Sequence, residues 1–442
     1  MPKVAVLGAG MVARPLVRYL LDLPDFNVAV ATRMISKAVL EIIDEHPRGE
    51  AKTLNVKDTP LLAGEVKSAD IVVSLVPYEY HVTVAKLCLK YKKHLVTTSY
   101  VGDDMKALDG EAKEAGVTLL NECGLDPGID HMSAMRIIHD VERNGGKIVS
   151  FRSTTGALPS HEANDNPFGY KFSWSPRGVL LASRNAAKWL EDGQEVSIPG
   201  EQLFENYYLL DVPGAGALEN YPNRNSVPYK EIYGLQDATT VYRGTFRMTG
   251  WCETLRRIVA LGWLQEDPIA GFSGKTYGDL TRQLIGTSAD ANLIGATAEF
   301  LQVAPYSAVI KRLEWLGLFS DRALPEDRDT PLDYLNVLSL EKMPLAEGER
   351  DMVVMHHEFV AEFASGKRER ITSTLVNYGI PGEDSSIART VSLPAAIAVK
   401  MLLEGKISVR GVFIPVQPEI YNPILDELEP VGITFVERKT AL

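Results

Sequence analysis

Hydrophobic residues change their spacing along this 442-residue chain, and each spacing is typical of a different kind of element. In the first 125 residues, short apolar runs alternate with stretches of helical periodicity at 12–23, 36–46 and 81–91. Such runs are typical of strands that are buried on both faces. We expect strands at 3–7, 27–33, 51–56, 69–77, 94–100 and 116–122. Strands that alternate with helices predict an α/β fold with a doubly wound parallel sheet.

The pattern changes after residue 125. Asp126 and Pro127 are typical of an N-cap and a first helical position, so we expect a helix that ends at Gly145-Gly146. Extended, turn-rich segments at 147–249 predict an α+β region, and the apolar spacing at 254–339 predicts helices.

A β-hairpin follows around the turn ASGK, at 364–367. Its alternation places Val353, Met355 and His357 on one face, so His356 points to the other face. The two histidines therefore cannot share a metal ion, and we expect both to be structural. A helix at 392–406 and a strand at 432–439 complete the prediction.

Composition and charge narrow the class of protein. The net charge is −12, from 58 acidic and 46 basic residues, which disfavours nucleic acid as a partner. We see no apolar run long enough for a membrane span and no signal peptide, so we expect a cytoplasmic protein. The three cysteines have neither paired nor metal-binding spacing.

The chemistry begins at Gly8-Ala9-Gly10-Met11-Val12-Ala13, directly after the first strand. This is the G-x-G-x-x-A pattern of dinucleotide-binding folds. Gly8 allows the tight turn, Gly10 lets a pyrophosphate approach the backbone, and Ala13 lets helix and strand pack closely. The alternative is a purely structural glycine turn.

The residues after the second strand indicate which dinucleotide is bound. An NAD enzyme usually places Asp or Glu there, against the ribose 2′-hydroxyl, whereas this strand ends in Thr32-Arg33. A guanidinium pairs with a 2′-phosphate and Thr32 adds a hydroxyl donor, so we predict NADP(H) over NAD(H). The alternative is a solvated arginine at a strand end.

Longer motifs then resemble one family, the glutamate-forming saccharopine dehydrogenases, also called saccharopine reductases. The resemblance spans essentially the whole chain. The matching stretches, in order, are GLDPGIDH (124–131), DNPFGYKFSWSPRGVLLA (165–182), YPNRNS (221–226), YRGTFR (242–247), EWLGLFSD, ERDMVVM and EIYNPILDEL.

The resemblance implies a variant Rossmann domain at 1–125 plus about 392–442. It also implies a mixed-sheet substrate and dimerisation domain at 126–253 plus about 345–391, and a helical closing domain at about 254–344. The implied enzyme is an NADP-dependent oxidoreductase of lysine metabolism that acts on CH–NH bonds. It joins L-glutamate and L-2-aminoadipate 6-semialdehyde as an imine and reduces this imine to L-saccharopine, or runs the reverse. A homodimer is also implied.

The resemblance assigns residues as well. The implied substrate residues are Ser99, Tyr100, Asp126, Arg224, Thr245, Phe246 and Arg247. Tyr100 and Asp126 are the candidates for catalysis, and no metal site is implied. The implied cofactor residues are Gly8, Gly10, Met11, Val12, Ala13, Thr32, Arg33, Asn55, Val56, Leu75, Val76, Thr98, Ser99, Leu125, Asp126 and Trp174.

These side chains suit a ligand with three carboxylates and two amino groups. Arg224 and Arg247 can pair with carboxylates, and Asp126 can accept a hydrogen bond from a substrate amine. Tyr100, Asp126 and His131 are all candidates for acid–base work, and bound water or the substrate amine could do the same. The alternatives are a surface ion pair for Arg224 and a helix N-cap for Asp126.

Departures from the family pattern leave other readings open. The family's SYCGGLPAPE is STTGALPSHE here, so a cysteine near the substrate becomes Thr154 or Thr155, and Met248 replaces a tyrosine. One alternative is a related reductase that acts on the imine of a carboxylated polyamine. Another is a non-catalytic NADPH-binding sensor, in which we would expect the charged anchors to have been lost.

Overall fold

The computed structural model describes the whole chain except residues 174–175, 270 and 272–273. Its contacts divide the chain into two compact units. Unit 1 comprises 1–147, 362–367 and 377–436. Unit 2 comprises 148–361, 368–376 and 437–442, so the expected helical segment at 254–344 lies within it.

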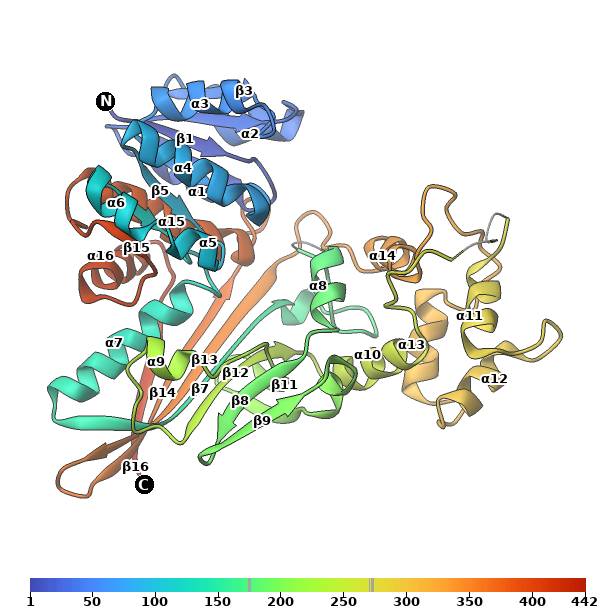
Figure 1. The fold of residues 1–442 in the computed structure, drawn as a ribbon. Helices are drawn as coiled ribbons and strands as arrows, with labels where there is room; N and C mark the ends of the chain where they lie inside the picture. The colour runs from blue at the N-terminus through green and yellow to red at the C-terminus, as the bar shows by residue number, and fades with distance from the viewer. Residues whose placement is uncertain (174–175, 270, 272–273) are drawn as a thin grey trace. The chain divides into compact units, whose positions relative to one another are not determined.

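A seven-stranded sheet forms the centre of unit 1 (Figure 1). All neighbouring strands are parallel, in the order β3-β2-β1-β4-β5-β6-β15. The first six strands follow the order of classic doubly wound folds, which confirms the predicted fold class. The strands are β1 (Lys3–Leu7), β2 (Asn27–Thr32), β3 (Gly49–Thr53), β4 (Ile71–Ser74), β5 (His94–Thr97), β6 (Thr118–Leu120) and β15 (Gly411–Phe413).

The sequence placed several of these strands imprecisely. β3 begins and ends earlier than expected, and β4 and β5 each end three residues before the predicted boundary. Leu75, Val76, Thr98 and Ser99 therefore lie in the loops just beyond their strands. Leu75 and Val76 continue the apolar run of β4, and Thr98 and Tyr100 after β5 are residue types common in strands, so the sequence alone overestimates strand length.

Helices accompany the sheet within unit 1. α1 and α4 begin and end within two residues of the predicted positions, whereas α3, α5 and α6 were not predicted. The helices are α1 (Ala13–Asp22), α2 (Lys37–Ile43), α3 (Thr59–Ser68), α4 (His81–Tyr91), α5 (Asp103–Lys106), α6 (Asp109–Ala115), α7 (Ile129–Arg143), α15 (Ser386–Leu403) and α16 (Pro418–Leu428), together with the 3₁₀ turn η1 (Tyr78–Tyr80).

The long helix α15 packs against α1 and the strands β4 and β5 (Figure 1). It returns to unit 1 after the whole of the segment 148–361. Its length and mean hydropathy of 1.4 would also suit a membrane span, but 78% of it is buried within the protein. We therefore identify α15 as a core helix of unit 1.

The prediction for Asp126 as a helix N-cap is wrong. α7 begins at Ile129, and Gly128 occupies the cap position. The Asp126–Pro127 peptide bond is cis, and Ile129 N donates to Gly124 O across the turn. The Asp126 carboxylate instead accepts a hydrogen bond from the Tyr100 hydroxyl.

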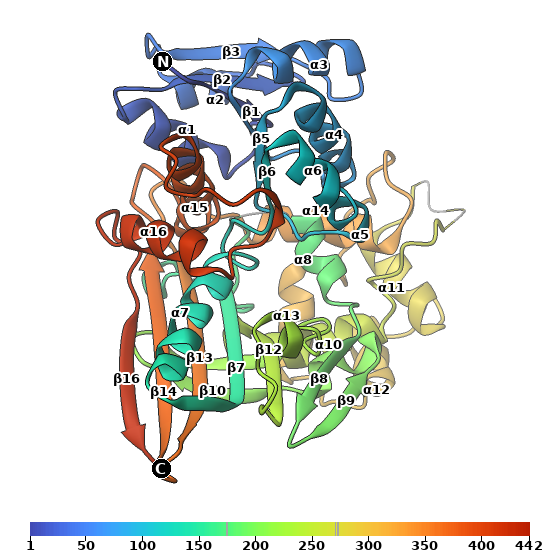
Figure 2. The ribbon, with the colours of Figure 1, turned by 60° about the vertical axis from the view of Figure 1, so that its left-hand side comes forward.

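A nine-stranded mixed sheet forms the centre of unit 2 (Figure 2). Its main order is β10-β11-β12-β7-β13-β14-β16, and β8 joins it through β12. β12 is parallel to β7 and antiparallel to β11, which confirms a mixed sheet. The strands are β7 (Gly146–Pro159), β8 (Ala187–Glu191), β9 (Gln194–Ile198), β10 (Tyr208–Val212), β11 (Gly216–Pro222), β12 (Thr240–Arg247), β13 (Asp351–Phe363), β14 (Arg368–Tyr378) and β16 (Val436–Ala441).

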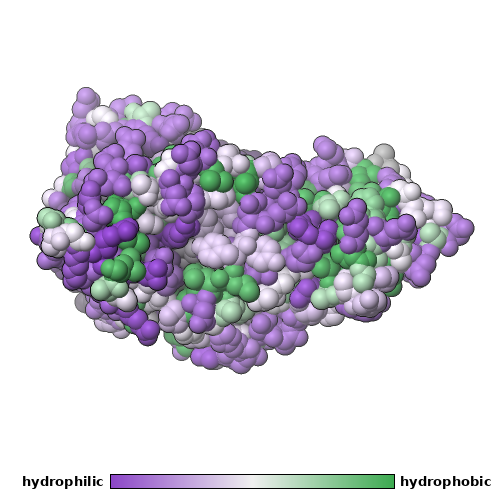
Figure 3. Space-filling view, turned by 90° about the horizontal axis from the view of Figure 1, so that it is seen from below, coloured by the Kyte–Doolittle hydropathy of each residue, from purple (hydrophilic) through white to green (hydrophobic). Residues whose placement is uncertain are grey.

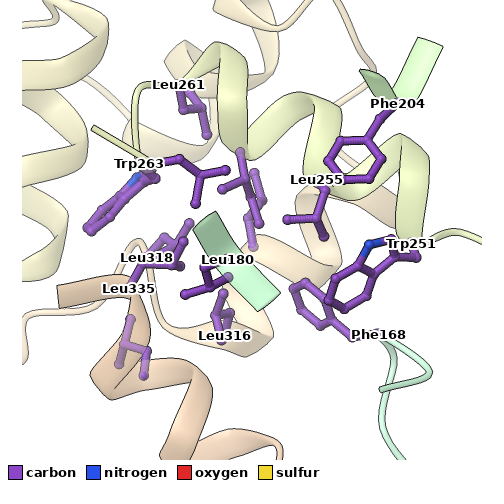
Figure 4. Packing of buried hydrophobic residues seen from close by; sticks show 14 of the residues in the cluster. Phe168, Leu180, Phe204, Trp251, Leu255, Leu261, Trp263, Leu316, Leu318 and Leu335 are labelled. Atoms are coloured by element: carbon purple, nitrogen blue, oxygen red, sulfur yellow. The ribbon is translucent and has the colours of Figure 1, made fainter. Parts of the chain in front are cut away.

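The predicted helical segment is confirmed, and its helices share one apolar cluster (Figure 4). Trp251, Leu255 and Trp263 come from α10 and the turn after it, and Leu316 and Leu335 come from α13 and α14. The helices of unit 2 as a whole are α8 (Pro176–Ala182), α9 (Tyr229–Ile232), α10 (Trp251–Ala260), α11 (Tyr277–Ile285), α12 (Leu293–Phe300), α13 (Ala308–Leu316) and α14 (Pro331–Lys342), with 3₁₀ turns η2 (His161–Ala163) and η3 (Gly200–Glu205).

The predicted hairpin is also present, as β13 and β14. His357 packs against Phe151 and Phe359, whereas His356 Nδ1 lies 2.8 Å from Thr374 Oγ1. The two histidines thus point to opposite faces, as their alternation predicted. Among the described residues, no three His, Cys, Asp or Glu side chains are grouped to hold a metal ion.

The surface in Figure 3 is mainly hydrophilic, with apolar side chains in separate groups. This agrees with a chain in which 24% of the residues are charged.

Candidate active site

The glycine loop after β1 has the geometry that a dinucleotide needs. Gly8 has a φ of 107°, and a Cβ there would lie 2.8 Å from Leu75 O. Gly10 faces open space, since a Cβ there would meet no atom within 4 Å. Ala13 is fully buried at the start of α1, whose first turn carries no acidic residue. The N-terminal N–H groups of α1 are therefore suited to a pyrophosphate.

The other predicted cofactor residues of unit 1 gather at the same edge of the sheet. Each ends a strand or follows one, and the carboxyl ends of parallel strands share one edge. They are Thr32 and Arg33 at β2, Asn55 and Val56 after β3, Leu75 and Val76 after β4, and Thr98 and Ser99 after β5.

Arg33 is exposed at this edge, with no ion pair among the described residues. No carboxylate stands beside it at the end of β2, where NAD enzymes place one. Met11, Met34 and Tyr78 are exposed near the same strand ends, with 63%, 72% and 80% of each residue's surface accessible. Apolar surface of this kind is common where a ligand binds.

A hydrogen bond joins the two predicted catalytic residues. The Tyr100 hydroxyl donates to Asp126 Oδ1 over 3.0 Å. Behind them, Glu122 lies 2.7 Å from His131 Nε2 and accepts from Val101 N. The backbone on both sides of Tyr100 is thus held by Glu122, which also donates its own N–H to Ser99 O.

Sequence reasoning missed His81, at the start of α4. Its ring nitrogens lie 2.8 Å from Ser74 Oγ and 2.9 Å from Ser99 Oγ. Only 5% of the residue is exposed, and this burial lowers the pKa of His81 to about 4. A histidine within an amphipathic helix gives no signal in sequence, because its partners lie on two other elements.

In unit 2, Arg247 is a buried cation at the end of β12. Its guanidinium carbon lies 5.1 Å from the ring centre of Tyr170, 5.4 Å from Trp251 and 6.0 Å from Tyr221. Nη1 donates to Phe246 O, but Nε has no hydrogen-bond partner among the described residues. A buried guanidinium with an unused donor is suited to bind an anion.

The strand register places Thr155 on the same face as Arg247. Thr155 pairs with Thr245, which pairs in turn with Tyr221, so their side chains form a row across three strands. The Thr155 hydroxyl is buried without a partner among the described residues. Thr154 points to the opposite face, where Asn220 Nδ2 donates to it. Thr154 and Thr155 lie in the stretch STTGALPSHE, which differs from the family pattern. Of the two, Thr155 is therefore the one beside the predicted substrate residues.

The remaining predicted residues differ in what they offer. Phe246 is fully buried on the face opposite Thr245 and Arg247, so its side chain does not join this row. Arg224 is exposed, with a φ of 52°, and its carbonyl accepts from Lys188 N. Leu125 is buried in unit 1. Trp174 lies outside the described residues.

The protein is an oxidoreductase of the Rossmann class with two compact units. Unit 1 supplies the sheet order and the glycine loop, and unit 2 carries the buried Arg247. The family profiles "Saccharopine dehydrogenase NADP binding domain" and "Saccharopine dehydrogenase C-terminal domain" match residues 4–120 and 124–433. The chain belongs to the saccharopine dehydrogenase family, and NADP(H) is its cofactor.

Full-length relatives agree with this assignment. The chain is 39% identical to "Saccharopine dehydrogenase [NADP(+), L-glutamate-forming]" of Schizosaccharomyces pombe, over 99% of both chains. It is equally identical to the Saccharomyces cerevisiae protein of the same name, again over 99% of both. The structure of apo saccharopine dehydrogenase (L-Glu forming) from Saccharomyces cerevisiae matches with a TM-score of 0.91, 38% identity and complete coverage of both chains.

Proposed function

We propose that this protein reduces the imine of L-glutamate and L-2-aminoadipate 6-semialdehyde to L-saccharopine with NADPH, or catalyses the reverse oxidation. Both directions belong to lysine metabolism. The observation that carries the proposal is the buried Arg247, whose Nε has no partner among the described residues and whose surroundings are aromatic. A substrate carboxylate would supply the missing partner.

NADPH, when bound, supplies the hydride for the imine carbon. In our proposal, the glycine loop and the N terminus of α1 hold its pyrophosphate, and Thr32 and Arg33 hold the 2′-phosphate. Asn55, Val56, Leu75, Val76 and Thr98 line the same edge. Leu125, which is buried, and Trp174 remain proposals by resemblance alone.

The residues that would move protons are Tyr100 and Asp126. Imine formation removes water from a carbinolamine, and the proton for the departing hydroxyl must come from a nearby acid. The hydrogen bond from Tyr100 to Asp126 fixes the orientation of both groups. Asp126 would accept a proton from the substrate amine, and Tyr100 would return one to the carbinolamine oxygen. Acid–base help of this kind typically contributes about 10²–10⁴-fold.

The proposed substrate residues are assigned one by one. In our proposal, Arg247 and Arg224 pair with carboxylates, Thr245 offers a hydroxyl, and Phe246 contributes through its backbone carbonyl, which Arg247 already contacts. Ser99 would face either the cofactor or the substrate.

The test is NADPH oxidation in the presence of L-glutamate and the semialdehyde, with NADH in a parallel assay. Turnover with NADPH and formation of saccharopine would support the proposal. If NADPH were consumed only when a carboxylated polyamine precursor replaced the amino-acid pair, the related reductase would be the better assignment. Binding of NADPH without turnover of either pair would indicate a sensor.

We also propose a homodimer in the cytoplasm, with neither nucleic acid nor membrane as a partner. The resemblance supports the dimer, and the acidic composition argues against nucleic acid. The cytoplasm and the lack of a membrane partner are the expectations of the sequence analysis, and the burial of α15 within the protein supports the latter. Light scattering coupled to size exclusion would test the dimer, since it should give twice the mass of one chain. Fractionation of the source cells would test the compartment.

A further inference from the structure

The polar cluster around His81 joins the ends of two neighbouring strands in unit 1. β4 ends at Ser74 and β5 ends at Thr97, and α4 begins with His81 between the two. The His81 ring lies 2.8 Å from Ser74 Oγ through Nδ1, and 2.9 Å from Ser99 Oγ through Nε2. The ring is therefore a bridge between a buried strand residue and the loop that carries Ser99 and Tyr100.

The charge of the ring limits what it can do. Burial lowers the pKa of His81 to about 4, so the imidazole is neutral at pH 7. A neutral imidazole has one N–H donor and one acceptor, and its tautomer is set by the partner of the other nitrogen. One ring nitrogen of His81 therefore donates its hydrogen bond and the other accepts one.

Ser74 decides which nitrogen donates. Its side chain is fully buried, and His81 Nδ1 is its only side-chain hydrogen-bond partner among the described residues. Buried hydroxyl groups seldom leave their hydrogen without an acceptor. Ser74 consequently donates to Nδ1, and the ring proton resides on Nε2. Thr97 Oγ1 is 3.4 Å from Nε2, a longer contact that does not compete with this bond.

The direction continues to Ser99. If Nε2–H donates to Ser99 Oγ, the Ser99 hydroxyl hydrogen is left to point away from the ring. Other contacts hold the same loop, since Ser99 N donates to Thr97 Oγ1 and Ser99 O accepts from Glu122 N. Ser99 is half-buried at the edge where the cofactor residues gather, so its hydrogen can reach an acceptor on a ligand bound there.

We propose that His81 is a positioning residue, which Ser74 holds as the Nε2–H tautomer and which orients the Ser99 hydroxyl as a hydrogen-bond donor to the bound ligand. The acceptor is an oxygen atom of either the nicotinamide cofactor or a substrate carboxylate. This inference rests on the proposed function for the identity of those ligands. The tautomer itself does not depend on it.

The tautomer can be measured directly. Selective ¹⁵N labelling of the eight histidines, with His81→Gln to assign the signal, should show His81 as Nε2–H. Ser74→Ala removes the donor that imposes this state, so the His81 signal should shift towards a mixture of tautomers. An Nδ1–H tautomer in the unaltered protein would overturn the inference.

The effect on ligands is tested by two variants. His81→Leu removes both hydrogen bonds, whereas the amide nitrogen of His81→Gln can still donate from the Nε2 position. We expect His81→Leu to weaken the affected ligand by roughly 3- to 10-fold, and His81→Gln to stay within about 2-fold of the unaltered protein. Fluorescence titration gives the NADPH dissociation constant, and the saccharopine KM at saturating NADP⁺ reports the substrate. The constant that moves identifies the ligand that Ser99 contacts.

His94→Leu is the matched control. His94 is also a histidine of unit 1 with a pKa lowered to about 4, but it starts β5, at the other end of the strand from Ser99. His94→Leu should lower the melting temperature and leave both ligand constants unchanged. A double-mutant cycle with Ser99→Ala completes the test, since His81→Leu should add no further loss there.

Each outcome separates the inference from the proposed function. Equal ligand constants in His81→Leu and the unaltered protein would overturn the inference, even with full turnover of saccharopine. So would equal losses in His81→Leu and His81→Gln, or the same loss with and without Ser99. Absence of any turnover with the amino-acid pair would overturn the proposed function instead, while the tautomer and NADPH titrations would still report on His81. Should His81→Leu fail to fold, the tautomer measurement still decides the question.

Discussion

The substitution Arg247→Met should weaken substrate binding far more than it lowers the free energy of unfolding. The reason is that Arg247 is a buried charge for which the protein supplies only some of the possible hydrogen bonds. Arg247 as a whole residue is 5% exposed, and its guanidinium makes one backbone hydrogen bond and three ring contacts between 5.1 and 6.0 Å. A hydrogen bond to a charged group contributes about 1.5–3 kcal/mol, and each ring contact about 0.5–2 kcal/mol. Burying the ion costs several kcal/mol, so these terms nearly cancel. Methionine has a similar length and no charge, and we expect the free energy of unfolding to change by less than about 1.5 kcal/mol.

Binding should respond much more strongly. If a substrate carboxylate pairs with Arg247, its loss costs about 2–5 kcal/mol, or roughly 30- to 5,000-fold in kcat/KM for saccharopine. The NADPH dissociation constant should not change. Steady-state kinetics, fluorescence titration and urea unfolding measure the three quantities.

Arg243→Met provides the comparison for this experiment. Arg243 lies on the same face of β12 and is also buried, but it donates to the Tyr229 hydroxyl over 2.8 Å and its guanidinium carbon lies 4.4 Å from the Tyr229 ring centre. It should therefore lower stability more than kcat/KM. A loss of more than about 3 kcal/mol of stability in Arg247→Met, with unchanged kcat/KM, would show that Arg247 is structural and refute the reasoning.

Three further predictions concern the cofactor, the core and the pH dependence of stability. Arg33→Asp should weaken NADPH binding at least about 10-fold and strengthen NADH binding, because a carboxylate repels the 2′-phosphate and accepts a hydrogen bond from a 2′-hydroxyl. Titrations with both nucleotides measure the two dissociation constants. An unchanged preference for NADPH would show that Arg33 is not part of the site. Leu335→Ala should cost about 2–4 kcal/mol in chemical unfolding, because Leu335 is 1% exposed in the helical cluster, whereas Leu340→Ala, at a 43% exposed position of the same helix, should cost less than about 0.5 kcal/mol. Burial and Arg410 lower the pKa of His94 to about 4 in the folded protein, whereas its pKa is about 6.5 in the unfolded chain. Between these two pH values the unfolded state binds more protons than the folded state. The free energy of unfolding should therefore fall as the pH falls from about 6.5 to 4. Thermal melts across that range should show the fall, and His94→Asn, which keeps an acceptor for Thr118 N, should reduce it; parallel curves would contradict the assignment to His94.

Much of the fold of unit 1 was accessible from the sequence, because its strands are short apolar runs bounded by polar residues. The parts that were missed have little local signal. α3 is only weakly amphipathic, although the Asp58 side chain caps it by accepting from Leu61 N. β15 is three residues long and pairs with β6, which lies almost 300 positions earlier in the chain. Pairing at such a distance cannot be seen in a local pattern.

The candidate site shows the same limit. The glycine loop and Thr32-Arg33 follow from their position after a strand, and the resemblance supplied Tyr100, Asp126 and Arg247. Neither route found His81, because its bonds to Ser74 and Ser99 exist only once two strands and a helix are in place. The N-cap prediction for Asp126 was wrong for a related reason. It used only the neighbouring residues in the sequence, which give no information about the hydrogen bond from Tyr100.

The return of α15 and β15 to unit 1 has a consequence for synthesis on the ribosome. When the first 147 residues have emerged, β6 still lacks its outer neighbour and α1 still lacks the helix that packs against it. Both partners arrive only after more than 200 further residues have been translated. During this interval the nascent nucleotide-binding domain is incomplete, with an unpaired sheet edge and an uncovered apolar helix face. We expect the nascent chain to depend most on chaperones at this stage.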